Sequence, residues 1–152
     1  MIDANKSRNQ LVEDWLTESG YLFKKSVHSG DECVFLVYED AANLGALLLE
    51  LTINDNTSKV ELLCSVVPFF PQINLEKVIE ECQKLTFVHH PFEFYVIDES
   101  VNAMCEFEAK TDKDFIAEIL AKLYLMKDAI DSSIINLNYA IFNGGKCASG
   151  KE

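Results

Sequence analysis

The chain has 152 residues, of which 49% are hydrophobic, and its thirteen basic and twenty-five acidic residues give a net charge of −12. This length suits one domain with its own core, and the hydrophobic content is too high for a disordered chain. The acidity argues against nucleic acid and anionic membranes as partners, because both bind basic patches. No stretch approaches the ~18 consecutive apolar residues of a membrane helix, and the N-terminus lacks the apolar segment of a secretory signal. We therefore expect a cytoplasmic protein.

The five cysteines do not form a recognisable metal or redox motif, because they are widely spaced and no C-x-x-C pair occurs. Four of them lie in predicted strands or a helix, and we expect these to be reduced thiols that pack as small hydrophobic side chains. Cys147 lies in a polar C-terminal segment. The sequence leaves open whether its thiol is reactive.

The first elements are a short amphipathic helix and two strands. Ser7 opens a capping-box pattern, and Gly20 suits the left-handed residue that ends a helix, so we predict a helix over residues 7–19. Strands are predicted over residues 21–28 and 33–38. The second strand is apolar on both faces, which is typical of a central position in a sheet.

The most strongly patterned stretch is residues 46–67, which alternate between apolar and polar positions on both sides of an Asn/Asp/Ser-rich turn. Side chains on a strand alternate between faces, so this pattern predicts a β-hairpin with one apolar face that helices must cover. The other face is mixed, and we predict that it binds a partner protein through Leu48, Glu50, Glu61 and Leu63. An ordinary half-polar exterior is the alternative, and the sequence does not decide which face is free.

The sequence of the second half of the chain predicts a helix, then a β-hairpin, then a final helix. The segment Pro68-Phe69-Phe70-Pro71 ends the hairpin, and its two phenylalanines could anchor a partner or plug the core. Asn74 is the expected N-cap of the second helix. Strands over residues 92–97 and 101–108 follow.

The last helix is predicted from a T-x-x-D cap at Thr111 to Asn143, with an apolar arc wider than one sheet face needs. Either the arc simply covers the sheet or part of it forms the seam of a symmetric dimer. The predicted seam residues are Tyr124, Met126, Ile130, Ile135 and Phe142. We expect one domain over residues 1–143 and a flexible tail over residues 144–152.

No residue pattern indicates catalysis, a metal or a cofactor. The adjacent His89 and His90 would point to opposite faces of an extended chain and are poor joint ligands. The paired carboxylates are what a chain this acidic contains by chance, and no nucleophile motif is present. We therefore expect a protein that is not an enzyme. A small-ligand binder or an enzyme assembled only in three dimensions remains an alternative.

The predicted architecture is α+β with a mainly antiparallel sheet, in the order α-β-β-β-β-α-β-β-α. That order, the size and the acidity resemble the YbjN-like proteins and the class I type III secretion chaperones between about Leu11 and Ile134. The residues that carry the resemblance are Trp15-Leu16-x-x-x-Gly20 at the end of the first helix, Pro68 before the second, and the strand Pro91–Asp98. This chain departs from the pattern in an extra predicted strand in the meander, and the dimerising element of the chaperones is not identifiable.

The resemblance implies a non-enzymatic, dimeric protein that holds an extended client segment across its sheet, as the secretion chaperones do. A YbjN-like regulator of a signalling, stress or motility pathway is the alternative. Together with the residue patterns, it leads us to expect a chaperone-like homodimer that binds a protein or peptide client through its sheet and a helix groove. The identity of the client and the geometry of the dimer are not encoded in any pattern that we recognise.

Overall fold

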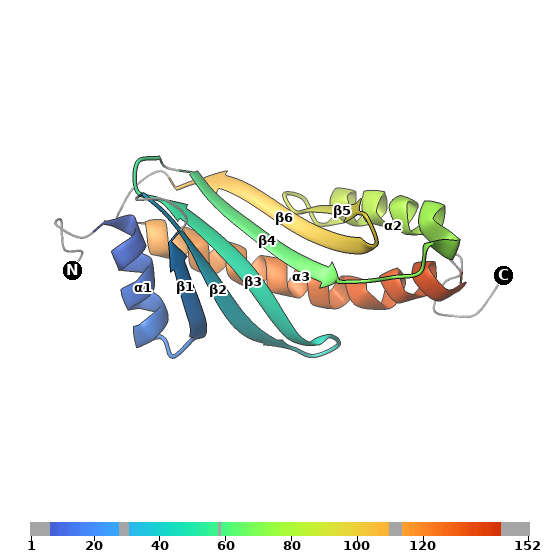
Figure 1. The fold of residues 1–152 in the computed structure, drawn as a ribbon, viewed down its shortest axis with the longest axis horizontal. Coiled ribbons are helices and arrows are strands. Elements are labelled where there is room, and N and C mark those ends of the chain that lie inside the picture. The colour runs from blue at the N-terminus through green and yellow to red at the C-terminus, as the bar shows by residue number, and fades with distance from the viewer. Residues whose placement is uncertain (1–6, 28–30, 58, 110–113, 144–152) are drawn as a thin grey trace.

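Six strands form one antiparallel sheet in the computed structural model of the chain, which describes residues 7–27, 31–57, 59–109 and 114–143 (Figure 1). The strand order is β1-β2-β3-β4-β6-β5, so β1 and β5 are the two edges. The first four strands form the expected meander. The strands are β1 (Leu22–Val27), β2 (Glu32–Ala41), β3 (Gly45–Asn54), β4 (Lys59–Val67), β5 (Glu93–Ile97) and β6 (Ser100–Glu108).

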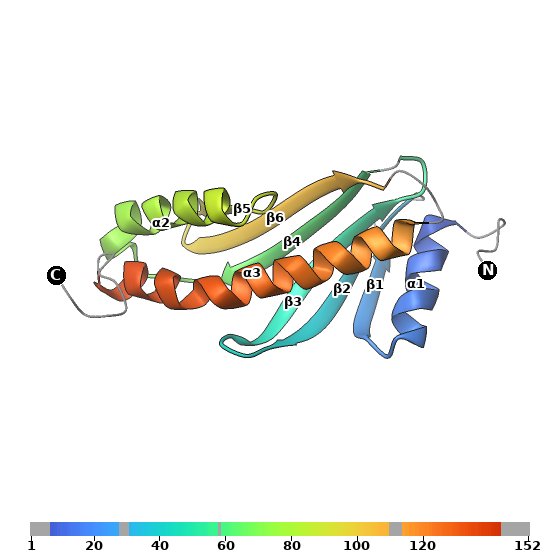
Figure 2. The ribbon, with the colours of Figure 1, turned by 180° about the vertical axis from the view of Figure 1, so that it is seen from behind.

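Helices cover only one face of this sheet. The longest, α3, crosses behind the strands in Figure 1 and in front of them in Figure 2. The first, α1, lies beside β1, and α2 packs against both β5 and α3. Their bounds are α1 (Arg8–Glu18), the short 3-10 helix η1 (Gln72–Asn74), α2 (Leu75–Val88) and α3 (Phe115–Asn143). The fold is therefore α+β, with the predicted order of helices and strands.

The hairpin of β3 and β4 is the centre of the core. Leu51 and Leu62 lie opposite each other on the covered face, and both are fully buried. Phe35 of β2 lies opposite Leu51 on the other side. Burial of one such side chain contributes roughly 1.5–3 kcal/mol to the free energy of folding, so the packing of helices on this face stabilises the fold. The alternation that predicted the hairpin is confirmed.

The end of β2 differs from the prediction. The strand extends past Tyr38 to Ala41, because its other edge pairs with β3 as far as Gly45. Its partner β1 begins only at Leu22, opposite Tyr38. The last residues of β2 therefore have a neighbouring strand on one side only, which leaves a step in the sheet.

Two predicted helix caps have different outcomes. The Ser7 side chain accepts a hydrogen bond from the N–H of Gln10, which confirms the first half of the predicted capping box, whereas the Gln10 side chain donates to the Asp14 carboxylate. The Asn74 side chain makes no cap bond; it donates to the carbonyl of Ile141 and ties the start of α2 to the end of α3. The predicted cap at Thr111 and the tail over residues 144–152 lie outside the described residues.

Candidate protein-binding surface

The face of the sheet opposite the helices, which we call the open face, has no described element packed over it (Figures 1 and 2). Its side chains alternate in sequence with those of the core, because neighbouring residues on a strand point to opposite sides. All four predicted binding residues of the β3–β4 hairpin lie on it: Leu48, Glu50, Glu61 and Leu63. The structure thus brings this predicted set together on the side without helices.

A row of side chains crosses the open face, with Glu50 in its middle, apolar residues on both sides of it, and Lys24 of β1 and Glu93 of β5 at its two ends. Leu36 lies opposite Glu50, Glu50 opposite Leu63, and Leu63 opposite Met104. All four side chains are half-buried against one another. The Glu50 carboxylate makes no hydrogen bond or ion pair within the described part of the chain. Since a charge beside apolar neighbours is poorly solvated, it would gain from a cationic partner.

The next row is apolar and more accessible. Leu22, Tyr38 and Leu48 lie side by side across β1, β2 and β3. Leu48 is 41% exposed although it sits on an inner strand of the sheet. Contiguous exposed apolar area of this kind is typical of surfaces that bind other proteins.

An acidic pair closes the opposite end of the open face. Glu61 of β4 lies opposite Glu106 of β6, whose carboxylate is 3.1 Å from the ammonium of Lys59. The pKa of Glu61 is raised, first by burial and then by a hydrogen bond to Glu106 and by its negative charge. Two carboxylates at opposed positions repel each other unless a proton or a cation lies between them.

The two edge strands differ in how they are protected. The β1 edge carries Lys24 and Lys25, and charged lysines discourage the pairing of further strands. The β5 edge has the sequence EFYVI and no lysine. A groove of about 390 Å³ separates β5 from α2; it is lined by Leu75, Ile79, Cys82, Gln83, Phe94, Tyr95, Val96 and Asp98. Phe94 in the middle of β5 already uses both of its main-chain groups: its N–H donates to the Thr86 hydroxyl of α2 at 2.9 Å, and its carbonyl accepts from the same hydroxyl at 3.2 Å. The helix α2 therefore protects the β5 edge, and a partner could use the groove but not add a full strand there.

The two predicted anchor phenylalanines have separate positions. Phe69 is 64% exposed just after β4. Phe70 is fully buried, and its N–H donates to the carbonyl of Glu99 at 2.7 Å. Phe70 is therefore a core residue, and the prediction that it contacts a partner is withdrawn.

The predicted dimer seam on α3 divides in the same way. Met126 and Ile130 are fully buried against the sheet of their own chain, so they are not available to a second copy. Their assignment to the seam was an error caused by the width of the apolar arc. Tyr124, Ile135 and Phe142 point away from the core, with 69% of Tyr124 exposed. They lie within about 20° of one line along the helix.

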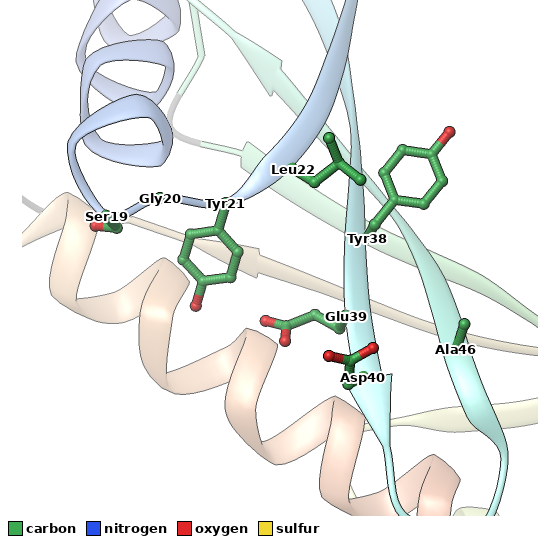
Figure 3. A pocket seen from close by; sticks show the side chains of 8 residues that line it. All are labelled: Ser19, Gly20, Tyr21, Leu22, Tyr38, Glu39, Asp40 and Ala46. Atoms are coloured by element: carbon green, nitrogen blue, oxygen red, sulfur yellow. The ribbon is translucent and has the colours of Figure 1, made fainter.

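A second cavity, which we call the corner pocket, lies where α1 leads into β1 (Figure 3). Its volume is about 500 Å³, and its lining residues are Ser19, Gly20, Tyr21, Leu22, Tyr38, Glu39, Asp40 and Ala46. No pattern in the sequence indicated it. The residues come from the α1–β1 connection and from β1, β2 and β3, which only folding brings together.

The described cysteines are packed in the core, as expected. Burial raises the pKa of the Cys64 thiol to about 12 and that of the Cys82 thiol to about 11. Cys33 and Cys105 are buried as well, whereas Cys147 lies outside the described residues. A thiol with a raised pKa is a poor nucleophile at neutral pH.

Two further properties concern the described part of the chain. It contains no group of three or more His, Cys, Asp or Glu side chains arranged to hold a metal ion. None of its helices combines the length and the apolar character needed to cross a bilayer.

A scan against protein-family models finds no match for the chain, and a search of curated proteins finds no relative.

Proposed function

We propose that the chain is a chaperone-like protein-binding domain without catalytic activity, which holds an extended segment of a partner polypeptide on its open face. The observation that carries this proposal is the unpaired Glu50 carboxylate between apolar neighbours on a sheet face without helices. Leucine side chains on both sides of it would contact apolar residues of the partner. The carboxylate would pair with a lysine or arginine between them.

The groove beside β5 supports the same proposal through side-chain contacts, because Thr86 already occupies the main-chain groups of Phe94. Alternate side chains of an extended segment can enter a pocket beside a sheet. The groove between α2 and β5 offers such a pocket, with Ile79 on one wall and Phe94 on the other. The proposed client is therefore extended, with alternating apolar and basic residues.

We also propose that two copies associate through the exposed stripe of α3 and that the protein works in the cytoplasm. A role as a YbjN-like regulator, in which the bound partner is a folded signalling protein, is the alternative to the chaperone role. The two roles differ in the kind of partner: a chaperone would bind an extended peptide, whereas a regulator would bind a folded protein and not the peptide.

Selection from a library of random 12-residue peptides tests the proposal. We expect enrichment of sequences with a basic residue between apolar ones. Glu50→Gln keeps the shape of the side chain and removes its charge. It should lower the affinity for the selected peptides about tenfold, as the loss of one charge-assisted hydrogen bond predicts. The matched control is Glu18→Gln at the exposed end of α1, which should bind like the parent chain. Failure to enrich any peptide, or equal binding by Glu50→Gln, would contradict the proposal.

A further inference from the structure

The corner pocket exists because β1 is shorter than β2. The helix α1 ends at Glu18, and Gly20 adopts a left-handed φ of +77° that turns the chain toward β1. The strand then begins at Leu22, opposite Tyr38, so Glu39 and Asp40 extend beyond it. The cavity of about 500 Å³ occupies this step at the edge of the sheet.

The lining of the corner pocket is acidic and aromatic. Its charged side chains are the carboxylates of Glu39 and Asp40, and none of its lining residues is basic. Figure 3 shows Tyr21 and Glu39 on the side of the sheet where α3 lies, with Leu22 and Tyr38 on the opposite side. An anion would be repelled from this pocket, whereas a cation with a short apolar stem would find both charge and apolar contact.

One of the two carboxylates is held in position by its neighbours. The pKa of Tyr21 is raised, first by burial and then by the charge of Glu39 and a hydrogen bond to it, so the hydroxyl keeps its proton and donates to the carboxylate. The ammonium of Lys127 on α3 lies 3.4 Å from the same carboxylate. The Tyr21 ring is in turn packed against Trp15, with 5.5 Å between ring centroids. Glu39 is therefore a rigid acceptor.

The second carboxylate is free to take a ligand. Asp40 is exposed on the open-face side of β2, opposite Ala46, and has no hydrogen bond or ion pair within the described ranges. Since Lys127 balances the charge of Glu39, the pocket keeps about one uncompensated negative charge. Tyr38 lies two residues earlier on β2 and therefore shares a face of the strand with Asp40.

We infer that the corner pocket binds an alkyl guanidinium group, as carried by an arginine side chain. A planar guanidinium can donate two parallel hydrogen bonds to the Asp40 carboxylate and can also stack on an aromatic ring, which a compact ammonium does less well. Leu22 and Ala46 would contact the aliphatic stem. This site is separate from the proposed peptide contacts at Glu50 and β5, and it can exist whether or not those contacts are correct.

Titration of the full chain with N-acetyl-arginine amide, followed by backbone amide NMR, tests the inference. We expect saturable shifts at Gly20, Tyr21 and Asp40. The matched control ligand is N-acetyl-citrulline amide, which has nearly the same shape but no charge, and it should bind at least about tenfold more weakly. A peptide with one arginine between glycines distinguishes the two sources of the group: tighter binding of the peptide indicates a polypeptide ligand, and equal binding indicates a small molecule.

Variants locate the site. Asp40→Asn should lower the affinity for N-acetyl-arginine amide about tenfold. Asp128→Asn changes another exposed aspartate, on α3, and should leave the affinity unchanged. Tyr38→Ala is a second variant that removes the ring without touching the core. The inference is overturned if arginine amide causes no saturable shift, if citrulline amide binds equally well, or if both pocket variants bind like the parent chain.

Discussion

Glu61 shows how one residue on the open face affects the stability of the fold. Its carboxyl lies opposite Glu106, and its pKa is raised above the ordinary 4.5. An acid whose pKa is higher in the folded state destabilises the fold above that pKa. As the pH falls, the Glu61 carboxyl is protonated in the folded chain at a higher pH than in the unfolded chain. The destabilisation is therefore absent below the pKa that this carboxyl has in the unfolded chain. Glu61 therefore costs stability at neutral pH.

Glu61→Gln is expected to stabilise the chain at pH 7 by about 0.5 kcal/mol, the size of one cross-strand repulsion. The gain should vanish at about pH 3.5, below the ordinary carboxyl pKa, where Glu61 is protonated in the folded and the unfolded chain alike. Urea denaturation at both pH values measures it. Glu106→Gln should gain less, because it also removes the ion pair with Lys59. A loss of stability for Glu61→Gln at pH 7 would show that the pair is not repulsive.

Asp131 joins two distant parts of the chain. Its carboxylate accepts hydrogen bonds from the N–H groups of Asn43 and Leu44 at 2.7 and 3.1 Å, and so fixes the turn between β2 and β3 to the middle of α3. Asp131→Ala should lower the free energy of unfolding by about 1–2 kcal/mol. Asp131→Asn keeps one acceptor oxygen and should lose about half as much. Equal stability of all three chains in urea denaturation would argue against this role.

At the scale of single elements, α3 has two different apolar faces. The inner face contacts the sheet and includes Met126 and Ile130, and the outer stripe includes Tyr124, Ile135 and Phe142. A helix with apolar residues on one side only would be satisfied by its own sheet. The outer stripe is therefore the part of α3 on which the proposed association of two copies depends.

Lysine substitutions on the outer stripe test this association. The parent chain should have twice its chain mass by light scattering, and the double variant Tyr124→Lys/Ile135→Lys should have the mass of one chain, because lysines on both copies would repel and remain poorly solvated in the seam. Leu48→Lys on the open face is the control and should leave the mass unchanged. A parent chain with the mass of one copy would contradict the dimer.

On the scale of the whole molecule, the surfaces are distributed across the sheet. The corner pocket lies at the β1 edge and the α2–β5 groove at the opposite edge, with the open face between them. The net charge of −12 creates a negative field around all three. Long-range attraction of this kind acts mainly on the rate at which a charged partner arrives.

Association of a basic peptide from the selection described above should therefore become slower as salt rises. We expect the association rate constant to fall about tenfold or more between 20 mM and 500 mM NaCl, while the dissociation rate constant changes much less. Stopped-flow fluorescence with a labelled peptide measures both constants. A neutral peptide of the same length is the control, and equal salt dependence of the two peptides would exclude electrostatic steering.

The sequence was enough to predict the order of the elements and the covered face of the sheet, because alternation and helical periodicity are local and are read from neighbouring residues. It also placed Leu48, Glu50, Glu61 and Leu63 together, since they share one face of one hairpin. Contacts in three dimensions were needed to establish that no described helix lies over this face, that β6 pairs with β4, and that Phe70, Met126 and Ile130 are in the core. Those facts depend on contacts between segments far apart in the chain, which no local pattern records. The corner pocket has the same origin, because it exists only where a short β1 meets a longer β2.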